Sequence, residues 1–131
     1  MATVPLISDA AASAEVLAVY ADIRATRGGD FINNFWRALA NDPALLAATW
    51  ARLKDVMGPG DLDPLVKEMI YIAVSVANGC SYCIHSHTAA ATAKGMSAEQ
   101  HGELLSVIGM AMQTNGMVTA MQVPVDEVFQ A

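Results

Sequence analysis

Charged residues are scarce in this chain. Lys, Arg, Asp and Glu make up 15% of its 131 residues, whereas about 25% is usual for a soluble domain. Basic residues are the scarcer kind, because seven Lys and Arg stand against 13 Asp and Glu. Binding to nucleic acid or to an anionic membrane surface depends on clustered cations. We therefore expect neither nucleic acid nor membrane as a partner.

Several motifs that mark common enzyme classes are also missing. The chain contains no Gly-x-Gly-x-x-Gly segment, no P-loop, no His-Glu-x-x-His pair and no serine-nucleophile elbow. Nucleotide binding, zinc-protease and serine-hydrolase chemistry therefore have no support. The N-terminal segment lacks a basic stretch followed by an apolar one, so we expect no secretory signal and a cytoplasmic protein.

Apolar residues, by contrast, are abundant at 54% of the chain. Residues 69–93 and 104–125 contain no Asp, Glu, Lys or Arg, but polar residues interrupt both stretches. The purely apolar run of the first, residues 69–74, is far shorter than the roughly 20 residues that a membrane span requires. We expect instead a soluble homo-oligomer that buries apolar surface between its copies.

Apolar spacing and helix-start signals predict an all-α fold with about six helices. Asp42 and Asp63 each precede a proline, and Ser97 forms a capping box with Gln100. Asp30 is a further candidate cap for a short helix. The helices are expected at about residues 13–27, 30–39, 42–57, 63–77, 80–94 and 97–121.

The β-branched run at residues 70–76 could form a buried strand on composition alone. The Asp-Pro start signal before it and the charged Glu68 within the pattern favour a helix instead. The chain shows no internal repeat and no linker. Its length suits one globular domain, which we expect to span residues 1–131.

The two cysteines form one Cys-x-x-Cys motif, Cys80 and Cys83, at the predicted start of a helix that follows an Asn78-Gly79 turn. Unpaired N–H groups and the helix dipole favour a thiolate at this place. Residues three apart are neighbours on a helix, so one sulfur could attack a sulfenic acid on the other. His87, four residues after Cys83, shares that face and could exchange a proton with the thiol.

Glu68 is expected to lie beside His87. Helices joined by a tight turn pack as an antiparallel hairpin, and both residues would lie at comparable depth in it because the helix rises about 1.5 Å per residue. A carboxylate beside an imidazole would hold the ring in one tautomer. Tyr82, between the cysteines, could line the mouth of the site and contact the substrate.

Glu68, Cys80, Cys83 and His87, with Gly95 closing the helix, resemble the core of the carboxymuconolactone decarboxylase superfamily, and within it the alkylhydroperoxidase D-like branch. Segments 31–36 and 41–46 are similar to it as well, so the likeness covers about residues 5–125. The resemblance implies an all-helical fold that assembles as trimers or hexamers.

The resemblance also implies a thiol peroxidase or a disulfide oxidoreductase. In the peroxidase, Cys83 would reduce a small hydroperoxide and Cys80 would resolve it as a disulfide. Glu68 and His87 would form a proton relay through a water molecule. An external dithiol of lipoyl or thioredoxin-like type would restore the thiols, and no haem, flavin or metal cofactor is required. Some members carry histidine where this chain has Tyr82. Decarboxylation is not implied, because that branch does not rely on the cysteine pair.

Two other interpretations of these residues stay open. The chain could be a non-catalytic or redox-sensing oligomeric protein with a degenerate site. Alternatively, Cys80, Cys83, His87 and Glu68 offer four potential ligands for a small zinc module. Structural zinc sites typically bring a second Cys or His pair from a distant segment, and none exists here.

Overall fold

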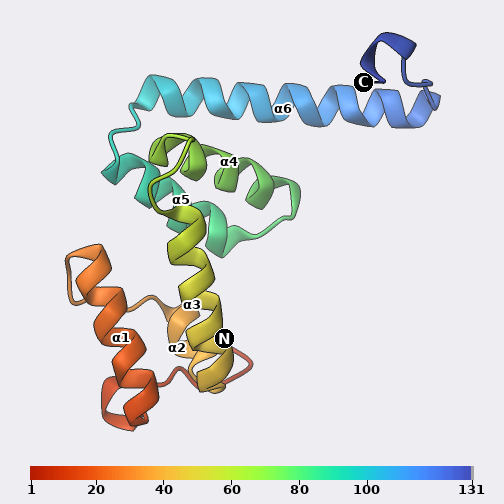
Figure 1. Ribbon diagram of the computed structural model, residues 1–131. Coiled ribbons are helices and arrows are strands. Elements are labelled where there is room, and N and C mark those ends of the chain that lie inside the picture. The colour runs from red at the N-terminus through yellow and green to blue at the C-terminus, as the bar shows by residue number, and fades with distance from the viewer. Residues whose placement is uncertain (131) are drawn as a thin grey trace. The chain divides into compact units, whose positions relative to one another are not determined.

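The computed structural model describes residues 1–130, which contain six α-helices, two short 3₁₀ helices and no strand. The predicted all-α fold with about six helices is therefore confirmed. In chain order the elements are η1 (Asp9–Ala11), α1 (Ala14–Arg27), α2 (Asn34–Leu39), α3 (Pro43–Met57), α4 (Pro64–Ala77), α5 (Ser81–Ala93), α6 (Ala98–Met121) and η2 (Glu127–Phe129) (Figure 1). They form two compact units, divided after Gly58. A single domain over residues 1–131 stays a prediction.

The helices begin where the sequence places good N-caps. The Asp42 carboxylate accepts the Leu45 N–H at 3.0 Å, and Ser97 forms the predicted capping box with Gln100. Asp63 caps α4 in the same way. Each cap satisfies backbone donors that the first helical turn leaves unpaired. The expected starts of α3, α4 and α6 are therefore confirmed.

The predicted helix start at Asp30 is wrong, because α2 begins only at Asn34. Arginine side chains from outside the segment satisfy its carbonyl groups. Arg24 Nε donates to the Asp30 carbonyl at 2.8 Å, and Arg37 Nε donates to the Ile32 carbonyl at 3.3 Å. Ile32 is also buried in the core. Side chains therefore satisfy two carbonyl groups of the segment without helical hydrogen bonds.

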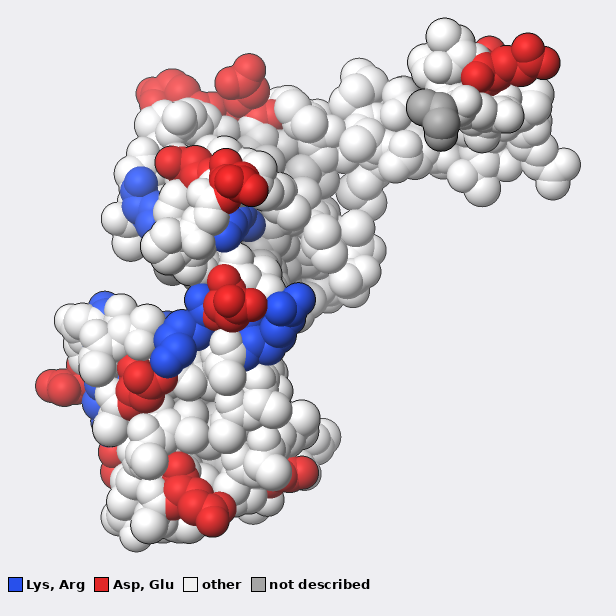
Figure 2. Space-filling view, in the orientation of Figure 1, with Lys and Arg blue, Asp and Glu red and all other residues white. Residues whose placement is uncertain are grey.

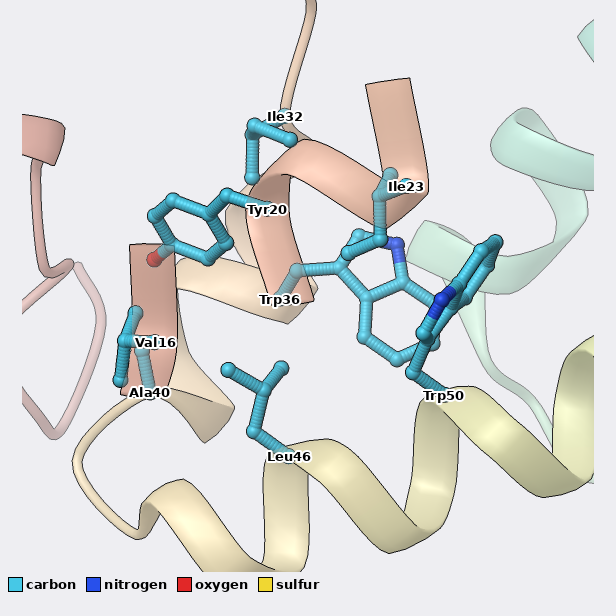
Figure 3. Close-up of a cluster of buried hydrophobic side chains, with 8 residues drawn as sticks. All are labelled: Val16, Tyr20, Ile23, Ile32, Trp36, Ala40, Leu46 and Trp50. Carbon is cyan, nitrogen blue, oxygen red and sulfur yellow. The ribbon is translucent and has the colours of Figure 1, made fainter. Parts of the chain in front are cut away.

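The first unit is organised around one apolar core between α1, α2 and α3. Trp36 and Trp50 meet edge to face, with ring centroids 5.4 Å apart and an interplanar angle of 82°, an arrangement that aromatic pairs prefer. Trp50 Nε1 donates to the Asp22 carboxylate at 2.6 Å, so its polar atom is satisfied. The core residues are Val16, Tyr20, Ile23, Ile32, Trp36, Ala40, Leu46 and Trp50 (Figure 3).

The second unit contains the predicted helical hairpin, formed by α4 and α5. Gly79 closes the turn between them with φ 65°, a left-handed conformation that glycine adopts without a steric penalty. The Cys80 N–H donates to the Ser75 carbonyl at 2.9 Å, which ties the start of α5 to the last turn of α4. The buried core of this unit is Ile72, Ala91, Met96 and Ile108.

Helix α6 extends well beyond the hairpin in Figure 1, and Ile108 is its buried residue. Figure 2 shows no acidic or basic residue along its C-terminal half. It is the one helix of residues 1–130 long and apolar enough to cross a membrane, by length and composition only. These features equally suit a helix covered by another protein chain. Its large exposed apolar residues are Leu105, Val107, Met110, Met112, Met117, Val118 and Met121.

The core of the first unit can be tested with two neighbouring leucines in α3. Leu46 is fully buried, whereas Leu45 is half exposed. Leu46→Ala should lower the free energy of unfolding by about 2–5 kcal/mol, because it removes buried methyl groups and leaves a cavity. Leu45→Ala makes the same chemical change at the surface and should cost less than about 1 kcal/mol. Urea denaturation measures both, and equal losses would contradict this core.

Candidate functional site

The Cys-x-x-Cys motif lies at the N-terminus of α5, as predicted. Cys80 is the N-cap residue, and its Sγ accepts the Cys83 N–H at 3.3 Å. Sulfur thus takes the place that an oxygen of Ser or Asp has at the other helix starts. The two cysteines form a disulfide with their Cα atoms 5.3 Å apart. In the reduced protein, the same N–H group and the helix dipole would favour a Cys80 thiolate.

Glu68 and His87 meet across the hairpin. His87 Nδ1 lies 2.7 Å from Glu68 Oε2, so the contact expected from their depth in an antiparallel pair is present. A carboxylate can only accept at this position, so Nδ1 carries the hydrogen. Nε2 of the neutral ring is then the free basic nitrogen. His87 follows Cys83 by one helical turn, on the same face of α5.

Two further residues contact this pair and were not predicted as site residues. Lys94 Nζ donates to Glu68 Oε1 at 2.9 Å. The Tyr71 ring stacks on the His87 ring, with centroids 3.6 Å apart and an interplanar angle of 18°. Helical spacing carried a signal for both, because Tyr71 follows Glu68 by three residues and Lys94 follows His87 by seven.

The carboxylate of Glu68 is buried, with 5% of the residue exposed, and yet it is stabilised as an anion. Burial raises the pKa of Glu68, but the hydrogen bonds from His87 and Lys94 and the Lys94 charge outweigh that effect. The net result is a pKa below the ordinary glutamate value. Glu68 is therefore ionised at neutral pH, and each of its oxygens accepts a hydrogen bond.

Tyr82 and His85 are exposed residues of α5. Tyr82 is 46% exposed on the first turn of α5, and its contact with substrate stays a prediction. His85 is exposed, and its Nδ1 lies 2.9 Å from the Ser81 carbonyl oxygen of its own helix. Nδ1 donates there, because a carbonyl oxygen only accepts.

Nothing in the described part of the chain is arranged as a metal site, since no group of three or more His, Cys, Asp and Glu side chains is placed to hold an ion. Cys80 and Cys83 are bonded to each other. Both Glu68 oxygens already accept hydrogen bonds from His87 and Lys94. In this geometry Cys80, Cys83 and Glu68 therefore have partners other than a metal ion.

The low pKa of Glu68 makes the stability of the second unit depend on pH. A carboxyl whose pKa is lower in the folded than in the unfolded state stabilises the fold fully above its unfolded value, near 4.5 here. That contribution is lost as the pH falls through the lower folded value. Glu68→Gln should therefore lower the free energy of unfolding at pH 7 by about 3 kcal/mol and flatten its decline in acid.

Denaturation of the wild type and of Glu68→Gln from pH 7 down to about pH 3 measures this dependence. Glu103→Gln removes an exposed carboxyl group from α6 and is the matched control. Parallel curves for the wild type and Glu68→Gln over the acid range would show that Glu68 is not paired as described.

Known proteins of similar sequence and structure agree with this architecture. A sequence model of the carboxymuconolactone decarboxylase family matches residues 43–126. An uncharacterized protein of Cupriavidus necator is 34% identical over 77 residues, which are 58% of this chain and 68% of that protein. The crystal structure of the alkylhydroperoxidase AhpD core of Rhodospirillum rubrum is 65% identical and superposes with a TM-score of 0.97, covering 100% of this chain and 98% of that one.

Proposed function

The chain belongs to the carboxymuconolactone decarboxylase family and has an AhpD-like fold, and on that premise we propose that it is a thiol-dependent hydroperoxide reductase. Its redox pair is Cys80 and Cys83, with His87 and Glu68 as the proton relay. The observation that carries the proposal is the cysteine pair at the start of α5, one helical turn from an imidazole that a buried carboxylate orients.

The first step oxidises Cys83. His87 takes the thiol proton at Nε2, the Cys83 sulfur attacks the terminal oxygen of the hydroperoxide, and the O–O bond breaks. The proton goes to the departing alkoxide, so the products are an alcohol and a sulfenic acid on Cys83. Glu68 stabilises the transient imidazolium through Nδ1, where it already accepts a hydrogen bond.

The second step closes the disulfide. The Cys80 thiolate, favoured by the Cys83 N–H group at its sulfur, attacks the sulfenic sulfur and releases water once a proton is supplied. An external dithiol of lipoyl or thioredoxin-like type then reduces the disulfide and is itself oxidised. A reducing compartment such as the cytoplasm would maintain that dithiol. These steps use no haem, flavin or metal.

Mass spectrometry of the reduced protein tests the two cysteine roles. One equivalent of an alkyl hydroperoxide should remove two hydrogens from the wild type, because Cys80 and Cys83 form a disulfide. Cys80→Ser should instead gain one oxygen and stop there, since no second thiol resolves the sulfenic acid. Cys83→Ser should show neither change and should lose hydroperoxide reduction. A Cys83→Ser variant with wild-type turnover and the same dithiol would contradict the mechanism.

A homo-oligomer, trimer or hexamer, is the second part of the proposal. Support comes from the exposed apolar residues of α6 and from the 54% apolar composition, because contiguous apolar surface of this kind marks an interaction site. α4 adds Val66, Ile70 and Val74, spaced four residues apart and all exposed. A second copy of the chain offers apolar surfaces of the same kind and would cover these.

Sedimentation of the full chain tests this assembly. The wild type should sediment as an oligomer at micromolar concentration, and Met117→Glu in the middle of the apolar surface of α6 should dissociate it, because a buried charge without a partner is costly. Ala18→Glu adds the same charge to an exposed position of α1 and should leave the mass unchanged. A monodisperse wild-type monomer, or protein found only in the membrane fraction, would contradict the proposal.

A further inference from the structure

Glu68 binds two different donors with its two oxygens. Oε2 accepts from His87 Nδ1 at 2.7 Å, and Oε1 accepts from Lys94 Nζ at 2.9 Å. The Glu68 side chain is 6% exposed, whereas the Lys94 side chain is 39% exposed. The anion is thus almost sealed in the hairpin, and its cationic partner reaches it from the surface.

A buried carboxylate requires a compensating positive charge. If His87 were the sole partner of Glu68, that charge would have to come from the imidazole, which would hold a second proton. An imidazolium cannot take the proton of a thiol, so it cannot be the base of the first step. Lys94 supplies the positive charge from a different group.

We propose that Lys94 is a positioning residue of the site: its ammonium group balances the Glu68 carboxylate, so that Glu68 orients the His87 ring while the ring stays uncharged. This inference rests on the proposed function, in which His87 is the base. Lys94 acts through Glu68 and touches neither the cysteines nor the substrate in the proposed reaction.

The local fold holds Lys94 in place. It is the C-cap residue of α5, and its N–H donates to the carbonyls of Ala90 and Ala91. It follows His87 by seven residues, two helical turns along the same face. Gly95, with φ 96°, ends the helix directly afterwards. Both donors therefore approach Glu68 from one rigid element.

The charged groups that lower the pKa of Glu68 are Lys94 and His87. Lys67, the neighbouring residue on α4, has its Nζ beside Gly60. On α4, Tyr71 faces His87 as a stacked ring. On α5, His85 is hydrogen-bonded to the Ser81 carbonyl. Helix α6, which packs against α4, contributes Glu99, His101 and Glu103 on its first two turns. The Glu99 side chain interacts with the Ser97 cap of that helix.

Nitrogen-15 NMR of the imidazole ring tests the proposal in the reduced full-length protein at pH 7. The wild type should show the neutral Nδ1–H tautomer of His87. In Lys94→Met the ratio of doubly protonated to neutral His87 should rise about tenfold, because the ring becomes the one cation facing Glu68. Lys94→Arg keeps the charge and should retain the wild-type spectrum.

Lys94→Gln keeps a hydrogen-bond donor but removes the charge, and it should behave like Lys94→Met. It also provides the uncharged variant to measure if Lys94→Met does not fold. His87 spectra like the wild type in both uncharged variants would overturn the proposal. A wild-type spectrum in Lys94→Gln alone would also overturn it, because the hydrogen-bond donor rather than the charge of Lys94 would then determine the state of His87.

The pH profile of hydroperoxide reduction gives a second measurement. The uncharged variants should lose activity at pH 7 and regain it at higher pH, where the ring is deprotonated, while Lys94→Arg follows the wild type. The ring spectra require no activity. If the wild type is inactive but the variants show the expected spectra, only the proposed function is contradicted. If the enzyme is active but the spectra of the uncharged variants equal that of the wild type, only the role of Lys94 is contradicted.

Discussion

A buried carboxylate between two helices is the interaction on which the second unit depends. Glu68 lies inside the α4–α5 hairpin with 5% of its surface exposed, where an unpaired anion would be strongly destabilising. His87 and Lys94, both from the second helix of the hairpin, each bind one of its oxygens. The ionic contacts therefore help to set the register of α5 against α4. Apolar packing of Ala91 and Ile72 is less directional and would define that register less precisely. The same contacts fix the orientation of the His87 imidazole ring.

The turn before α5 has a comparable double role. Gly79 reverses the chain, and the Cys80 N–H binds the Ser75 carbonyl. Cys80 then acts as the N-cap, with its sulfur in the place of a capping oxygen. Sulfur is the weaker hydrogen-bond acceptor, so Cys80 caps the helix less effectively than Ser or Asp would. The same position favours the thiolate form of the reduced cysteine, because a capping thiol lies where the helix dipole stabilises an anion most.

Much of this arrangement could be predicted from the sequence, because it depends on local signals. Helix starts at Asp42, Asp63 and Ser97 follow from caps that act within three residues. The meeting of Glu68 and His87 follows from a tight turn and a constant rise per residue. The start assigned to Asp30 failed because the side chains of Arg24 and Arg37, six and five residues away, satisfy two carbonyls of that segment. Lys94 was not predicted as a site residue, because helical spacing places it on the face of His87 but the direction of its side chain is set by packing across the helix pair.

The second unit, which contains the candidate site, has a smaller buried core than the first. The second unit buries four apolar residues, against eight in the first, although it carries the long helix α6 and the redox pair. The free energy gained by burying four apolar residues is small compared with the conformational entropy that the chain loses on folding. The ion pairs of Glu68 do not make up the difference, because burying charges is costly even when they are well paired. The proposed oligomer would add stabilisation at the exposed apolar residues of α6 and of the outer face of α4. Since Glu68 and Ile70 belong to the same two turns of α4, an oligomer that covered Ile70 would also restrict the helix that carries the carboxylate bound to His87.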